Sequence, residues 1–202
     1  MSAQSIPYFD VFAFTNRMFA GNPAGVCLLT EFLPNEQLQA IATQNDLPET
    51  AFLVDRGDHF DLRWMTPAVE VDLCGHATLA SAHCLFEEGV AAPIRFVTRS
   101  GVLTVDRSPD GLLAMDFPSW PPTEIDARAA AAEALGSLVE WTGRTDNEFF
   151  LLALVSDERS VRDLKPDLHA VGGLDASAVI VTGPADPGQE FDFVSRLFAP
   201  KA

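Results

Sequence analysis

Residues 71–78 have the sequence Val-Asp-Leu-Cys-Gly-His-Ala-Thr, which predicts a glycine-containing turn that opens into a helix. Small residues recur at helical spacing as far as Glu88, so this helix is expected to pack closely on a sheet. Unpaired amides and the helix dipole at such a start favour a carboxylate or another anion, which we expect at residues 75–77. His76, in the first turn, could hydrogen-bond a ligand or shuttle a proton. The simpler alternative is that Gly75 only permits the turn and His76 caps it.

Glu49 is the second candidate, because it follows a Leu-Pro pair and immediately precedes an expected strand at residues 50–54. Catalytic carboxylates are common at such strand ends, since the strand holds the side chain while the loop leaves it accessible. Apolar neighbours such as Phe52 would raise the pKa of Glu49 and suit it to exchange protons as acid and base. Considered alone, Glu49 is more simply explained as a solvated loop charge. We expect Glu49 and His76 to face one cleft.

Cysteine and histidine side chains near this turn also raise the question of a zinc site. Thiolates and imidazoles are offered by Cys74, His76, His83 and Cys84, but their spacing does not match the usual separation of zinc ligands. We therefore expect no metal. A nucleophilic Cys74 remains open, whereas racemase chemistry with two thiols would need a cysteine from the second half, which has none after Cys84.

Alternating strand and helix signals predict an α+β protein with two domains. The proline-rich segment at residues 118–122 can continue neither a helical nor a strand period, which makes it the best linker candidate. We predict an N-terminal domain at 1–117, a linker at 118–124 and a partial C-terminal domain at 125–202. Expected strands are 6–14, 25–29, 50–54, 60–65, 94–98, 102–106, 112–117, 139–142 and 148–155, and expected helices are 34–45, 75–88 and 125–135.

A weak internal repeat relates the two halves. Three segments recur in the same order: 38–41 as 168–171, 51–54 as 178–181, and 63–67 as 196–200. Each copy predicts a helix, a strand and a second strand that ends in proline. In the first half a long helix follows that proline, whereas the sequence stops two residues after the second one, so the second domain is expected to be incomplete. Chance similarity between short segments is the alternative.

The composition and the net charge of the chain limit the kinds of molecule that it can bind. The chain has 202 residues, of which 48% are hydrophobic, so it can bury a core. Lys and Arg number 13 against 29 Asp and Glu, and the net charge of -16 repels phosphate backbones and anionic lipids. We therefore expect neither a nucleic acid nor a membrane as partner. The start of the sequence has no signal-peptide pattern and the three cysteines suggest no disulfide framework, so a cytoplasmic location is expected.

Three motifs in order give the sequence a family resemblance. Residues 10–12 are followed by Gly-Asn-Pro-Ala-Gly-Val at 21–26, then by Asn-Asp-Leu-Pro-Glu-Thr-Ala-Phe at 45–52, and then by the segment from Thr66-Pro67 to Thr78. Together they resemble the N-terminal signatures of the phenazine-biosynthesis (PhzF-like) isomerase family, over essentially the whole chain.

This resemblance implies a diaminopimelate-epimerase-like fold, with two similar domains that each wrap a sheet around a central helix, and usually a homodimer. It also implies a cofactor-independent isomerase in which a glutamate moves a proton across a dihydro-hydroxyanthranilate. Glu49 matches that glutamate, and Gly75, His76 and Ala77 match the substrate-binding turn of the first domain. The expected partner is a small carboxylate-bearing metabolite.

The resemblance also implies residues that this sequence lacks. The family carries an Asp and a Gly-Ser-Ala-His-like turn in the second domain, after a strand that ends like Phe198-Ala199-Pro200. Only residues 201–202 follow here. A catalytically inactive, truncated homologue that serves as a small-molecule-binding or dimerisation module is therefore the alternative to an active isomerase.

Overall fold

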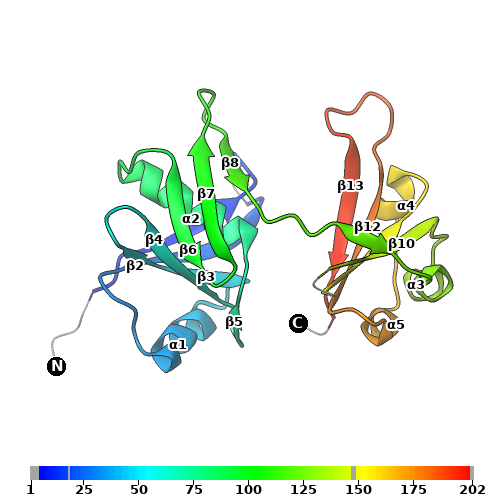
Figure 1. Ribbon diagram of the computed structural model, residues 1–202, viewed down its shortest axis with the longest axis horizontal. Coiled ribbons are helices and arrows are strands. Elements are labelled where there is room, and N and C mark those ends of the chain that lie inside the picture. Colours follow the sequence, from blue (N-terminus) through cyan, green and yellow to red (C-terminus); the bar gives the residue numbers. More distant parts are fainter. Residues whose placement is uncertain (1–4, 18, 147–148, 201–202) are drawn as a thin grey trace. The chain divides into compact units, whose positions relative to one another are not determined.

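The computed structural model describes residues 5–17, 19–146 and 149–200, and the chain divides into two compact units, 1–117 and 118–202. The first unit contains β1 (Tyr8–Ala13), β2 (Asn22–Leu29), α1 (Asn35–Asn45), β3 (Glu49–Asp55), β4 (Phe60–Met65), β5 (Glu70–Val71), α2 (Gly75–Glu87), β6 (Ile94–Thr98), β7 (Gly101–Arg107) and β8 (Leu113–Asp116). The second contains β9 (Pro122–Glu124), α3 (Arg128–Leu135), β10 (Trp141–Thr145), β11 (Phe150–Leu154), α4 (Glu158–Arg162), α5 (Leu168–Gly173), β12 (Ala178–Pro184) and β13 (Phe193–Phe198). Figure 1 labels most of these elements.

The sheet of the first unit has the order β1-β2-β3-β4-β6-β7-β8, with β5 paired to β4. Two of its neighbouring pairs are parallel, β2 with β3 and β4 with β6. Parallel neighbours need a crossover, and α1 and α2 supply the two crossovers. Helix α2 packs against β1, β2 and β3 and also against β8, which come from opposite ends of the strand order. The sheet is therefore curled around α2.

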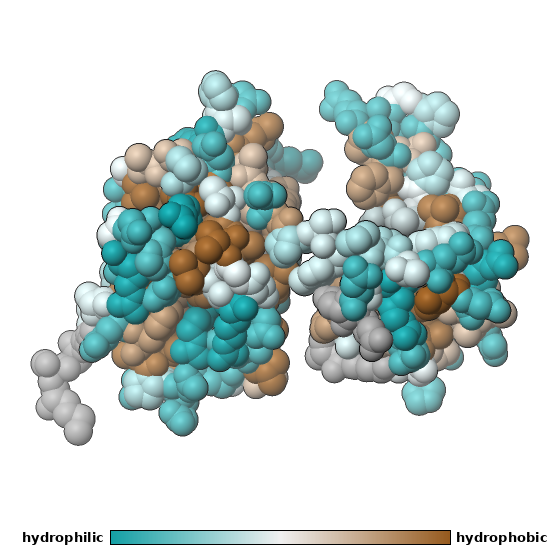
Figure 2. Space-filling model, viewed as in Figure 1, coloured by the Kyte–Doolittle hydropathy of each residue, from teal (hydrophilic) through white to brown (hydrophobic). Residues whose placement is uncertain are grey.

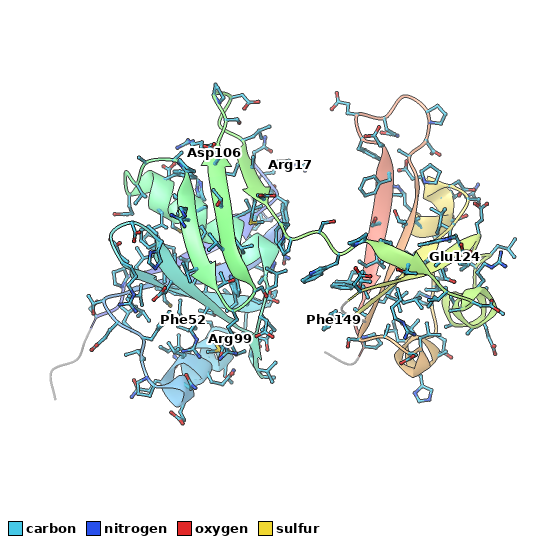
Figure 3. The ribbon with its side chains drawn as sticks, in the orientation of Figure 1. Arg17, Phe52, Arg99, Asp106, Glu124 and Phe149 are labelled. Carbon is cyan, nitrogen blue, oxygen red and sulfur yellow. The ribbon has the colours of Figure 1, made fainter. Side chains whose placement is uncertain are left out.

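Both faces of this sheet are buried at its centre, in β2, β3 and β4. The α2 face carries alternate residues of the central strands, including Val26, Leu53 and Trp64, and it packs against small residues of the helix such as Ala77 and Ala80. The opposite face carries Phe52, Cys27 and Met65 against Leu38 of α1; the position of Phe52 can be followed in Figure 3. Because each strand turns successive side chains to opposite faces, residues 51–54 of β3 are all apolar rather than alternating.

The second unit has a sheet of order β13-β12-β11-β10-β9, in which only β11 and β12 are parallel among the described strands. Helices α4 and α5 form the crossover between them, and α3 packs beside α5. Leu151, Val179 and Val181 of the sheet meet Leu135 and Val171 of the helices in one core.

The internal repeat predicted from the sequence corresponds to a repeated topology. The order β1-β2-α1-β3-β4 in the first unit matches β10-β11-α4-α5-β12-β13 in the second, with the parallel pair and its antiparallel neighbours in the same places. Residues 38–41 lie in α1 and 168–171 in α5, so the segments first matched by sequence occupy equivalent positions. The α+β prediction and the repeat are confirmed.

Some boundaries differ from the expectation. Residues 122–124, placed at the end of the linker, form β9, because their backbone pairs with β10. Strands β5 and β9 and helix α4 were not expected. Residue 148, the expected first residue of the strand that is β11, lies outside the described residues.

The surface mixes polar and apolar side chains in both units, as Figure 2 shows for one face of the molecule. In the part of the chain that the structure describes, no helix has both the length and the apolar character needed to cross a membrane.

Candidate active site

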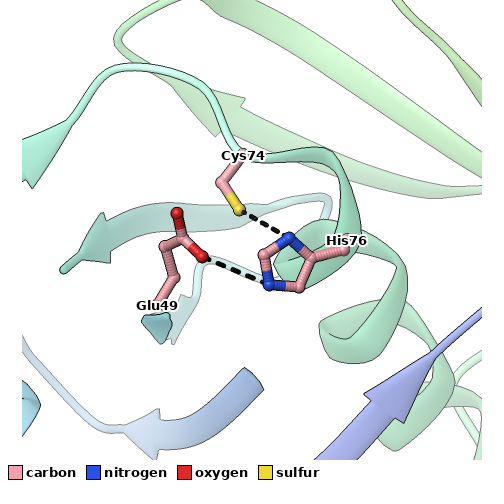
Figure 4. A group of neighbouring side chains, drawn as sticks. All are labelled: Glu49, Cys74 and His76. Carbon is pink, nitrogen blue, oxygen red and sulfur yellow. Dashed lines mark hydrogen bonds and ion pairs between the residues drawn. The ribbon is translucent and has the colours of Figure 1, made fainter. Parts of the chain in front are cut away.

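Three side chains of the first unit converge where β3 starts and α2 begins. Glu49 is the first residue of β3 and shares the α2-facing side of that strand with Ala51 and Leu53. Cys74 is the N-cap of α2, and His76 lies in its first turn. Figure 4 shows the carboxylate, the thiol and the imidazole directed toward one another. The prediction that Glu49 and His76 share one location in the fold agrees with this geometry.

The imidazole of His76 lies at the centre of the cluster. Its Nε2 is 3.2 Å from Oε2 of Glu49 and also 3.2 Å from the carbonyl oxygen of Pro23 in β2. Its Nδ1 is 3.4 Å from Sγ of Cys74. The side chains of His76 and Glu49 are only 11% and 20% exposed, so these contacts are largely shielded from water. Low exposure strengthens electrostatic interactions between the groups.

Burial raises the pKa of Glu49 above its ordinary value, while the neighbouring His76 and a hydrogen bond from the Cys74 thiol lower it and do not cancel the rise. Its Oε2 atom is buried and has no hydrogen-bond partner among the described residues, despite its closeness to His76. A carboxyl group with a raised pKa holds its proton to a higher pH than a solvated glutamate does, which suits it to accept and return a proton.

The thiol of Cys74 is held in its protonated form. Burial and the Glu49 carboxylate raise its pKa to about 12, although hydrogen bonds from the backbone of Ala77 and His76 act in the other direction. Since the thiolate is the reactive form, this cysteine is a poor nucleophile and a good candidate for a neutral hydrogen-bond donor.

Gly75, the first residue of α2, lies close to Phe117. A side chain at this position would meet the end of the Phe117 ring at 2.9 Å, so a larger residue would require that ring to move. The first hydrogen bond of the helix runs from the amide of Thr78 to the carbonyl of Cys74, which leaves the amides of residues 75–77 outside the helical pattern. The backbone amides of His76 and Ala77 also hydrogen-bond the Cys74 sulfur. An anion with Gly75, His76 and Ala77 as the binding residues would have to share these amides with the sulfur, and it remains a prediction.

Glu49, Cys74 and His76 each offer one potential metal-ligand atom, and the three atoms lie within 4.8 Å of one another. This group differs from the set weighed from sequence, because Glu49 takes the place of His83 and Cys84. A metal would bind the thiolate form of Cys74, and its binding would release the thiol proton. The expectation of no metal stays a prediction.

Two members of the site were missed or misjudged from sequence. The Pro23 carbonyl contacts His76 across 53 residues, and a backbone oxygen leaves no signal in residue types. Cys74 was weighed only as a metal ligand or a nucleophile. Its position directly before the helix glycine was the available signal, because an N-cap side chain lies beside the first turn.

Comparisons with known proteins agree with the fold and the motifs. The family model described as phenazine biosynthesis-like protein matches residues 11–202. A protein of Pseudomonas aeruginosa described as an uncharacterized isomerase is 47% identical over 95% of this chain and 72% of its own length. The crystal structure of a PhzF-family phenazine biosynthesis protein from Enterococcus faecalis has a TM-score of 0.88 at 40% identity, and covers 98% of this chain and 75% of that one. A hydroxyproline epimerase from Agrobacterium vitis, 12% identical with a TM-score of 0.54 over 95% of this chain and 69% of its own, shows the fold alone.

Proposed function

Because the chain belongs to the phenazine biosynthesis-like (PhzF) family, whose relatives include proteins named isomerases, we propose that it moves a proton between two atoms of a small carboxylate-bearing metabolite, with Glu49 as the acid and base. The observation that carries this proposal is the Glu49 carboxyl group, whose pKa is raised by burial and whose Oε2 lies 3.2 Å from Nε2 of His76. Such a group gains more from accepting a proton than a solvated glutamate does.

The proposed reaction is a balanced proton transfer. The Glu49 carboxylate takes a proton from one carbon of the substrate, the electron pair shifts along the conjugated system, and the same carboxyl returns the proton to another carbon. Nothing is oxidised or reduced, so the step needs no cofactor. His76, 3.2 Å from Glu49, stabilises the ionised carboxylate before the transfer. The amides of residues 75–77 would hold the substrate's carboxylate.

The test is isotope exchange in heavy water with a dihydro-hydroxyanthranilate as the probe. We expect the wild-type chain to incorporate deuterium into the ring, and Glu49→Gln to lose at least about 100-fold of that rate, since general acid–base catalysis typically contributes 10²–10⁴-fold. Glu87→Gln, an exposed glutamate on α2, is the matched control and should keep the wild-type rate. Exchange that is indifferent to Glu49→Gln would overturn the proposal.

Residues 1–202 span about three-quarters of the length of the relatives they match. The alternative function is a small-molecule-binding or dimerisation module. Saturable binding of the same probe, followed through the His76 resonances, with no deuterium incorporation would favour this alternative.

A further inference from the structure

The tautomer of His76 follows from the atoms around its Nε2. The carbonyl oxygen of Pro23 lies 3.2 Å away and can only accept a hydrogen bond. The other neighbour is Oε2 of Glu49, also at 3.2 Å and an acceptor whenever the carboxyl is ionised. Two acceptors at one ring nitrogen favour the tautomer in which this nitrogen carries the hydrogen. We therefore expect the proton of His76 on Nε2, between Pro23 and Glu49.

The opposite ring nitrogen then needs a donor. A neutral imidazole with its proton on Nε2 has a bare Nδ1, which acts as an acceptor. Sγ of Cys74 lies 3.4 Å from this atom, within the range of hydrogen bonds that involve sulfur. The cysteine is only 6% exposed and its thiol stays protonated, so it has a hydrogen to donate.

We propose that Cys74 is a positioning residue whose neutral thiol donates to Nδ1 of His76 and thereby fixes the imidazole proton on Nε2, facing Glu49. The role goes beyond the proposed function, which assigns nothing to Cys74, but its kinetic consequence rests on that function. Without this donor the ring could carry its proton on Nδ1, and a bare Nε2 would then face the lone pairs of Glu49 and Pro23. That arrangement repels the carboxylate that the proton transfer needs.

The thiol has a competing acceptor, because it also lies within hydrogen-bonding reach of the Glu49 carboxylate. One hydrogen cannot serve both acceptors fully. If the thiol donated to Glu49 alone, removal of the thiol would change the carboxylate and leave the histidine tautomer as it was. The two arrangements are therefore separable by a measurement on the imidazole.

The decisive experiment is long-range ¹H–¹⁵N NMR of the histidine rings, which distinguishes protonated from bare ring nitrogens without any substrate. The chain has only four histidines, so assignment by substitution is practical. In the wild type we expect one His76 tautomer with the proton on Nε2. In Cys74→Ala we expect Nδ1-protonated or mixed ring signals, and in Cys74→Ser, whose hydroxyl also donates, a return to the wild-type pattern.

Cys84→Ala is the matched control, since this cysteine is 5% exposed and lies on the same helix but is absent from the cluster. It should leave the His76 signals unchanged, and unaltered His59 and His169 signals would show that each variant is folded. An Nδ1-protonated His76 in the wild type, or an unchanged tautomer in Cys74→Ala, would overturn the proposal.

Isotope exchange adds the kinetic arm. Loss of a group that orients a metal-bound histidine typically costs about 10–100-fold in activity. By the same reasoning, Cys74→Ala should lose about that factor and Cys74→Ser should regain most of it. If the tautomer shifts in Cys74→Ala but the wild type shows no exchange, the role of Cys74 stands and the proposed isomerase activity fails. If exchange depends on Glu49 but the tautomer in Cys74→Ala is unchanged, the isomerase activity stands and the role of Cys74 fails.

Discussion

The parallel strand pairs of the two units have the same topology but different surroundings. In the first unit, β2 and β3 are covered by α2 on one face and by α1 on the other. In the second unit, α3, α4 and α5 cover one face of β11 and β12, and no helix among the described residues covers the other. That other face forms an open groove of about 720 Å³.

The sequences of these strands do not indicate this difference in burial. Residues 51–54 are Ala-Phe-Leu-Val and residues 178–181 are Ala-Val-Ile-Val, and both are apolar runs typical of strands buried on two faces. Leu53 is 1% exposed, whereas Ile180, its counterpart in the repeat, is only half-buried. The sequence of β12 is therefore typical of a strand buried on both faces, but the described residues cover only one of its faces.

The largest effect should come from truncating the two counterparts. Leu53→Ala removes a fully buried side chain under α2 and should lower the free energy of unfolding of the first unit by about 2–5 kcal/mol. Ile180→Ala should cost less than about half of that in the second unit. Urea unfolding can separate the units, because Trp64 reports on the first while Trp120 and Trp141 report on the second. Equal losses would mean that the groove is covered in solution.

Our next prediction is that a second copy of the chain covers this groove. Ile180 pairs with Leu197 across β12 and β13, and Leu197 is 59% exposed. Burying such area contributes about 25 cal/mol per Å². The double variant Ile180→Ser, Leu197→Ser should therefore lower the mass measured by light scattering toward the monomer. Leu112→Ser, at an exposed leucine in a turn of the first unit, is the control and should change nothing. A monomeric wild type would contradict this expectation.

Overpacking should give a third, smaller difference. Ala80 is 1% exposed and lies where α2 approaches the sheet, so Ala80→Leu should destabilise the first unit by about 1–3 kcal/mol. Ala170→Leu, on the half-buried part of α5, should cost clearly less in the second unit, because the larger side chain can turn toward solvent. The same urea titration measures both, and similar costs would show that α5 packs as tightly as α2.

Two glutamates should give the smallest but most specific contrast. The pKa of Glu49 is raised by burial, whereas that of Glu158 is lowered by the Asp186 amide and by Arg162. A raised folded-state pKa costs stability as pH rises from the ordinary value of 4.5 through the folded value, so Glu49→Gln should gain stability over the wild type in that window. A lowered pKa contributes stability that is lost on acidification, so Glu158→Gln should be destabilised at neutral pH and the deficit should close as pH falls. Urea unfolding across this range measures both, and a common sign would contradict the assignment.

Sequence patterns predicted the elements whose signals are local. The proline before α1 and the glycine that begins α2 act through their own backbone, and these helices lie where they were expected. The strand expected at 25–29 after the Gly-Asn-Pro segment starts earlier, because β2 begins at Asn22. Strand β9 was missed because its residues are Pro-Thr-Glu and only pairing with β10 makes them a strand. The convergence of Glu49 and His76 was predicted, but the hydrogen of the Cys74 thiol and the carbonyl of Pro23 depend on distances that residue types do not encode.

The contact between Pro23 and His76 also bears on how the protein folds. The two residues are 53 positions apart, and α1, β3, β4 and β5 lie between them in the sequence. Contacts of such long sequence separation form slowly, because chain entropy must be lost before they stabilise anything. The hydrogen bonds of His76 should therefore appear with the last cooperative step in the folding of the first unit. The NMR signals of its ring would then report when the first unit has finished folding, even in a chain whose second unit is still unfolded.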